Sequence, residues 1–170
     1  MSDKLNSAAL HRVMLIHLNE VLYGPGADAY FLNPGDRGLI ASLEMLSADV
    51  ASARPGGRSS VASHVDHLRY GLSLLNRFAH GEDPFDEADW AESWTRQHVT
   101  DDQWKTLRAE LARESRAWME AMKHPPQWDE AGLASAVGSI PHLAYHLGAI
   151  RQLAQAASGP SAAAPEPGRP

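Results

Sequence analysis

Cysteine is absent from this chain of 170 residues. Its absence excludes disulfides, thiolate metal ligands and a cysteine nucleophile, so any metal ion must be bound through His, Asp or Glu. Positive charge is also scarce, because 15 Lys and Arg residues stand against 21 Asp and Glu residues and the formal net charge is −6. An acidic chain without a basic run lacks the electrostatic pattern of nucleic-acid-binding proteins. We therefore expect no nucleic acid among its partners.

Long apolar runs are missing as well. No stretch approaches the roughly 18–20 apolar residues that span a bilayer, and the first residues, MSDKLNSAALHRV, lack the apolar core of a signal peptide. These features predict a cytoplasmic protein with no membrane partner. The chain length is typical of one domain. We expect that domain over residues 1–157 and a disordered tail over residues 158–170, because the tail is rich in Pro and Ala.

Apolar residues recur at steps of three and four, which is typical of helices that face a common core. The clearest run consists of Val61, Val65, Leu68, Leu72 and Leu75. Breaks at Gly and Pro separate four predicted long helices, near residues 5–23, 59–80, 100–124 and 129–157, and a short extra helix near 37–53. Strand-like alternation is not evident. The expected fold is therefore all-α, an antiparallel four-helix bundle with long loops.

Polar residues mark where two of these helices begin. Ser59 or Ser60 would cap the helix near 59–80, and Thr100 with Gln103 resembles a capping box. Between the helices, residues 24–36 carry two aromatic side chains and are expected to pack down on the core. Residues 82–99 are expected to be irregular with one short helix, and their Trp90 and Trp94 are candidates for lining a pocket.

Nine histidines make a metal site worth testing. His142 and His146 are four residues apart, so a helix places both rings on one face, one turn apart. Leu143 stands where an HExxH metallopeptidase carries its glutamate, which argues against that class. A Glu-x-x-His pair does not occur in the chain, which argues against a ferritin-like di-iron site.

A third histidine is expected from the helix near 59–80. His64 lies between Val61 and Leu68 on the apolar stripe and should face the core, whereas His67 is expected farther round, toward the flank. Antiparallel packing could then bring His64 to the His142/His146 pair, with His67 as its competitor. Three imidazoles with open positions are typical of a catalytic divalent-metal site. Asp66, Glu20 and backbone carbonyls are equal candidates for the hydrogen-bond acceptors that would fix the tautomer of each ring. His17 is a candidate for lining a pocket.

Two segments of the sequence resemble a known family. The segment PHLAYHLGAIRQ at residues 141–152 resembles the last-helix signature of the DinB-like superfamily, which includes DinB and YfiT-type proteins. The segment SVASHVDHL at residues 60–68 resembles its second-helix signature, and the resemblance extends over roughly residues 6–155. It implies that His64, His142 and His146 are the metal ligands.

The resemblance also implies a four-helix bundle, often a homodimer, that holds a divalent metal ion. Some relatives are transferases or isomerases that act with mycothiol, bacillithiol or related thiols. Relatives often carry a tryptophan in the loop after the first helix, where this chain has Tyr30 and Phe31. This departure affects substrate specificity and leaves the ligands untouched.

Three functions remain open from the sequence. A metal ion held by three neutral imidazoles would ionise a bound thiol, which suits a metal-dependent transferase of small thiols such as mycothiol, bacillithiol or glutathione. It would equally lower the pKa of a bound water, which suits a hydrolase that uses a bound hydroxide. A non-enzymatic, stress-related metal-binding protein is the third candidate. Zinc, nickel and iron all suit such a site.

Overall fold

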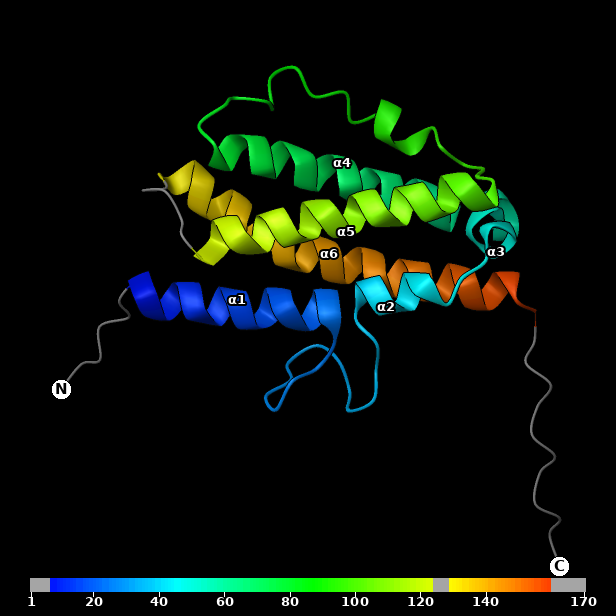
Figure 1. The fold of residues 1–170 in the computed structure, drawn as a ribbon, viewed down its shortest axis with the longest axis horizontal. Helices are drawn as coiled ribbons and strands as arrows, with labels where there is room; N and C mark the ends of the chain where they lie inside the picture. Colours follow the sequence, from blue (N-terminus) through cyan, green and yellow to red (C-terminus); the bar gives the residue numbers. More distant parts are fainter. Residues whose placement is uncertain (1–6, 124–128, 160–170) are drawn as a thin grey trace, which may run out of the picture.

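The computed structural model describes residues 7–123 and 129–159, and within these ranges the regular structure is entirely helical. The expected all-α class is therefore confirmed. The helices are α1 (Ser7–Tyr23), α2 (Leu39–Glu44), α3 (Ala48–Ser52), α4 (Val61–Ala79), α5 (Asp101–Lys123) and α6 (Glu130–Ala157), with short 3-10 turns η1 (Pro55–Gly57) and η2 (Glu92–Trp94). Figure 1 shows the long helices lying lengthwise along the molecule.

The predicted boundaries of the long helices are accurate to within two residues for α4, α5 and α6. Ser60 caps α4, since its hydroxyl accepts a hydrogen bond from the backbone N–H of Ser63. Thr100 and Gln103 form the expected capping box at the start of α5, each side chain accepting from the other residue's backbone N–H. Capping side chains thus set these boundaries locally.

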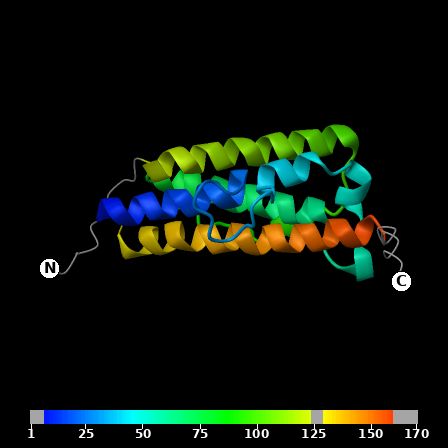
Figure 2. The same cartoon turned by 90° about the horizontal axis from the view of Figure 1, so that it is seen from below.

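Residues 37–53 form two short helices where the sequence predicted one. The side chain of Ser47 accepts a hydrogen bond from the backbone N–H of Val50 and so caps α3 as a new helix. A serine that bonds to its own backbone competes with a continuous helix. Figure 2 shows α1 followed nearly end to end by α2, with α5 on one side and α6 on the other.

The relative directions of the helices depart in part from the expected antiparallel bundle. Contacts pair His64 with His146 and His67 with His142, so α4 and α6 are antiparallel. In contrast, α4 and α5 run in the same direction, because the segment of residues 80–100 crosses back along the molecule before α5 begins (Figure 1). The expectation of an antiparallel order therefore applies to α4 with α6 and does not apply to α4 with α5.

Ion pairs and hydrogen bonds between α4 and α5 agree with this parallel order. Arg69 lies 3.7 Å from Glu110, and farther along both helices the side-chain nitrogen of Asn76 donates to Glu114 at 2.8 Å. A single core joins all the long helices and α2. Its largest fully buried side chains include Leu18, Leu22, Leu39, Leu68, Leu107, Leu111, Trp118, Met122, Leu143 and Leu147.

The segment between α1 and α2 is held by a buried carboxylate. Glu20 is 1% exposed and accepts hydrogen bonds from the backbone N–H groups of Tyr30, Phe31 and Leu32 at 2.7–3.0 Å. The segment was expected to pack down on the core, and it does so through these hydrogen bonds and through Leu32, whereas the rings of Tyr30 and Phe31 are 63% and 46% exposed. The backbone of this segment is anchored, and its aromatic rings are not buried.

Two further expectations concern the chain ends and membranes. Of the tail predicted to be disordered, residues 160–170 lie outside the described residues. Among the helices that the structure describes, none combines the length and the apolar character needed to cross a bilayer.

Candidate metal centre

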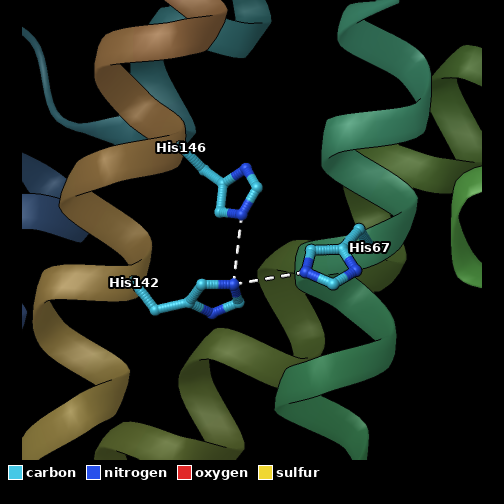
Figure 3. A group of neighbouring side chains, drawn as sticks. All are labelled: His67, His142 and His146. Atoms are coloured by element: carbon cyan, nitrogen blue, oxygen red, sulfur yellow. Dashed lines mark hydrogen bonds between the residues drawn. The ribbon is translucent and has the colours of Figure 1, made fainter. Parts of the chain in front are cut away.

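Three histidine rings meet between α4 and α6 (Figure 3). The Nε2 atom of His142 lies 3.2 Å from Nε2 of His67 and 3.1 Å from Nε2 of His146. One ligand atom from each ring lies within 4.8 Å of the other two. A tetrahedral zinc ion with Zn–N distances of about 2.0–2.1 Å would separate its nitrogen ligands by about 3.3 Å. These three histidines could therefore hold a metal ion.

The helix periodicity explains why α6 offers two of these rings. Leu143 and Leu147 are 1% and 2% exposed and pack α6 against the core. His142 and His146 each precede one of these leucines by one residue, so their rings emerge beside the core and toward α4. His146 is buried and His142 is half-buried. The predicted placement of this pair on one helix face is observed.

His64 lies in the same cluster but against a different nitrogen. Its Nδ1 atom is 2.8 Å from Nδ1 of His146, on the side of that ring away from the converging Nε2 atoms. His67, which the sequence placed toward the flank, is as buried as His64, at 8% exposure each. Residues three apart on a helix differ by about 60° in direction, so both can face α6. The structure thus brings all four histidines together, and His67 supplies the third converging nitrogen.

The hydrogen bonds around the cluster fit the tautomers that metal binding requires. An imidazole that binds the metal ion through Nε2 must present a lone pair there, so its proton sits on Nδ1 and needs an acceptor. Nδ1 of His67 is 2.9 Å from Oγ of Ser93, and that hydroxyl donates to the backbone carbonyl of Trp90 at 2.7 Å. Nδ1 of His146 faces Nδ1 of His64, which can accept. Two of the three rings are therefore oriented for a metal ion.

Burial keeps these imidazoles neutral at physiological pH. It lowers the pKa of His64 and of His142 below the ordinary value of 6.5. Burial, followed by repulsion from His142 and His64, lowers the pKa of His67 to about 4. Burial and the three neighbouring histidines lower the pKa of His146 to about 3. Only the neutral form of an imidazole binds metal, so the cluster is ready to bind without first losing protons.

The segment of residues 80–100, called the crossing segment below, covers the outer side of the histidine cluster. The ring of Trp94 stacks on His67 with 4.3 Å between ring centroids and meets the edge of His64 at 5.1 Å. Asp66 holds this segment in place, because its carboxylate lies 3.2 Å from Arg96 as well as 2.8 Å from Arg69. Trp94 therefore lines the site, as the sequence had suggested.

The acceptor that fixes His67 was not among the candidates from the sequence. Asp66 and Glu20 were both considered, but Asp66 pairs with arginines and Glu20 bonds to backbone N–H groups. Ser93 lies 26 residues from His67 in the sequence, and a lone serine in an irregular segment carries no recognisable signal. His17, a candidate for lining a pocket, contacts the rings of Tyr30 and Phe31 outside this cluster.

A wide cavity adjoins the cluster on the side of His64. It has a volume of about 840 Å³, and its lining includes His64, Trp94, Tyr145, Arg58 and Gln152. Of the four histidines, His64 is the one that lines this cavity, so a small molecule bound there would meet the cluster at His64.

Comparison with known proteins returned no match, whether to a family model, a curated protein or a solved structure. The chemistry of the site therefore rests on the residues described above.

Proposed function

We propose that this chain is a DinB-like protein that binds a divalent metal ion through His67, His142 and His146 and transfers small thiols. The observation that carries the proposal is the convergence of three neutral imidazole nitrogens within 4.8 Å of one another. The Nδ1 partners of His67 and His146 support it, because they orient two of the rings for a metal ion.

The family assignment and the bundle are part of this proposal. The HxxxH pair on α6 and a histidine on α4 are the elements that the DinB-like resemblance implies, and the four long helices α1, α4, α5 and α6 support the proposed four-helix bundle. The sequence assigned the α4 ligand to His64. We propose His67 in that place, with His64 as the residue that orients His146, because His64 contacts Nδ1 and not Nε2 of that ring.

A divalent ion at this site would supply the positive charge that ionises a bound thiol at neutral pH. The surrounding residues favour a thiol over a water molecule as the nucleophile. Hydrolysis commonly needs a general base beside the attacking water, and the nearby carboxylate of Asp66 is paired with Arg69 and Arg96. A metal-bound water reaches a pKa of only about 7, whereas a coordinated thiol is deprotonated outright and releases its proton to solvent. Because the chain has no cysteine, the thiol comes from a small-molecule substrate.

Metal content and turnover test this proposal together. The protein is loaded with Zn²⁺, Ni²⁺ or Fe²⁺ and assayed with glutathione, mycothiol or bacillithiol and an electrophile such as monochlorobimane. We expect one metal ion per chain and thiol-dependent turnover that His67→Ala abolishes. Ester hydrolysis without thiol would favour the hydrolase. A bound metal ion without either activity would favour a non-enzymatic metal-binding protein.

A homodimer is the remaining element of the proposal. Val13 and Ile16 lie one helical turn apart on α1 and are 46% and 43% exposed, so they offer apolar surface that a second copy could cover. Light scattering at micromolar concentration should give twice the chain mass of 18.5 kDa. A mass equal to that of one chain would contradict the dimer and leave the metal site unaffected.

A further inference from the structure

A second, smaller cavity lies between α4 and α6 and adjoins His142. Its volume is about 230 Å³. Helix α4 contributes Leu68, Gly71 and Leu72 to its wall, α6 contributes Gly138, and the crossing segment contributes Phe85 and Trp90. This cavity lies on a different part of the cluster from the wide cavity at His64, because the two linings share no residue. The histidine cluster is thus approached by two separate cavities.

The lining of this small cavity is mostly apolar, and its polar side chains are Ser135, Ser139 and His142. Ser139 is one of its few polar residues, but its hydroxyl already accepts from the indole N–H of Trp118 at 3.1 Å and donates to the carbonyl of Ala136 at 2.8 Å. His142 is the one lining residue that belongs to the group of converging histidines. A ligand here would therefore contact mainly apolar side chains along its length and reach His142 at one end.

Two glycines keep this space open. A Cβ atom at Gly138 would have nothing within 4 Å. A Cβ atom at Gly71 would lie 3.6 Å from the Trp90 ring and 4.0 Å from Cε1 of His142, which are ordinary contacts. Both glycines lie inside helices, where glycine is less stable than alanine by roughly 0.5–1 kcal/mol. An alanine could occupy either position without a clash, and the open space around Gly138 leaves room for a larger side chain that would take up part of the cavity.

We propose that this cavity binds the apolar part of the substrate, an aromatic or branched aliphatic group whose polar end lies at His142. A cavity of about 150 Å³ lined by apolar side chains is large enough to bind benzene. The observed volume of about 230 Å³ therefore fits a phenyl ring with a few further carbon atoms. Apolar lining with few polar groups is typical of small-molecule sites. The placement of the polar end at His142 rests on the proposed function, whereas the binding of an apolar group in the cavity does not.

Toluene tests the apolar part in the metal-free protein, because it has no group that binds metal. Its binding is followed through the indole N–H signal of Trp90 in nuclear magnetic resonance spectra. We expect saturable shifts of this signal. Gly138→Leu should weaken toluene binding about tenfold or more by filling the cavity. Gly148→Leu is the matched control, since Gly148 is also exposed on α6, has nothing within 4 Å and does not line the cavity.

The polar end is tested in the metal-loaded protein with two thiols. Phenylmethanethiol carries an aromatic ring and 2-mercaptoethanol does not. Gly138→Leu should weaken phenylmethanethiol about tenfold and leave 2-mercaptoethanol unchanged. Gly71→Ala, which adds one methyl group from the opposite wall, should have a smaller effect of the same sign.

The two arms separate failure of this inference from failure of the proposed function. If toluene does not shift Trp90, or if Gly138→Leu and Gly148→Leu bind it equally well, the apolar site is wrong even if the metal binds. Equal weakening of both thiols by Gly138→Leu would also overturn it. If the protein binds no metal but toluene behaves as expected, the apolar site stands and the proposed function fails.

Discussion

Two buried polar clusters of this molecule contrast in how their hydrogen-bonding groups are satisfied. At the end of α1, the carboxylate of Glu20 receives the backbone N–H groups of three consecutive residues, Tyr30, Phe31 and Leu32. Between α4 and α6, the nitrogens of neighbouring histidines face one another at 2.8–3.2 Å. The first arrangement gives a buried charge donors that the chain itself provides. The second concentrates lone pairs that only a proton or a metal ion can share.

This contrast separates a structural polar cluster from a candidate site. A buried charge must be paired or hydrogen-bonded to be tolerated, and Glu20 meets that condition while anchoring a loop. Burial by itself would raise the pKa of Glu20, but the three backbone N–H groups, together with His17, hold it below its ordinary value of 4.5. Burial lowers the pKa of the histidines and leaves them neutral, which suits metal binding.

The largest expected effect concerns the converging nitrogens. His67→Ala removes one of three ligands and should weaken zinc affinity about a thousandfold or more. Calorimetric titration with Zn²⁺ measures this effect, and His98→Ala is a control because His98 is exposed. If His67→Ala retained stoichiometric zinc and His64→Ala lost it, the ligand set would be His64, His142 and His146.

Glu20→Gln tests the structural cluster. An amide keeps the size of the side chain but removes the charge that the three backbone N–H groups bind. Hydrogen bonds to charged groups contribute about 1.5–3 kcal/mol, so we expect the free energy of unfolding to fall by about 2–3 kcal/mol. Urea denaturation measures this change. Zinc affinity should be unchanged, and a parallel loss of zinc binding would show that the two clusters are not independent.

His64→Ala should have an intermediate effect on the metal site. Loss of a residue that orients a ligand typically costs 10–100-fold in metal affinity, and His64 contacts Nδ1 of His146 at 2.8 Å. We expect one zinc ion still to bind, with affinity reduced by this factor. His64→Gln, which offers a side-chain oxygen as an acceptor, should restore part of the loss. Equal effects of both variants would contradict the orienting role.

The smallest effects are expected in how the free energy of unfolding of the metal-free protein depends on pH. They distinguish the histidine cluster from Glu20 by the pH range in which each acts. The pKa of His67 is about 4 and that of His146 about 3, whereas an unfolded histidine titrates near 6.5. The unfolded state therefore binds more protons, and stability is lost as pH falls from about 6.5 toward these values. Between pH 7 and pH 5.5 the loss is about 1 kcal/mol for each such histidine.

Glu20 acts in a lower pH window. Because its folded pKa lies below 4.5, its contribution to stability is complete above that value and is lost as pH falls below it. Urea denaturation at several pH values separates the two contributions. His146→Gln should reduce the loss between pH 6.5 and pH 5, and Glu20→Gln should reduce only the loss below about pH 4.5. The reverse assignment would contradict the comparison.

Several features of the molecule follow from local sequence and were predicted from it. Ser60 and the Thr100–Gln103 pair cap α4 and α5 as predicted, because capping is a contact between residues that are close in the sequence. His142 and His146 share a face because their spacing matches the helix repeat. The all-helical class follows from the apolar spacing of three and four. These features depend on interactions within a few residues, which the sequence displays directly.

The third ligand, the orienting residues and the chain direction were decided only by the tertiary structure. His64 and His67 are three residues apart, nearly one helical turn, and are equally buried. Only the position of α6 along α4 therefore determines which of the two rings meets Nε2 of His142. Ser93 reaches His67 because residues 80–100 cross back over α4, and that same crossing makes α4 and α5 parallel (Figure 1). The length of a connecting segment does not reveal its path, because its route depends on distant contacts such as that of Arg96 with Asp66.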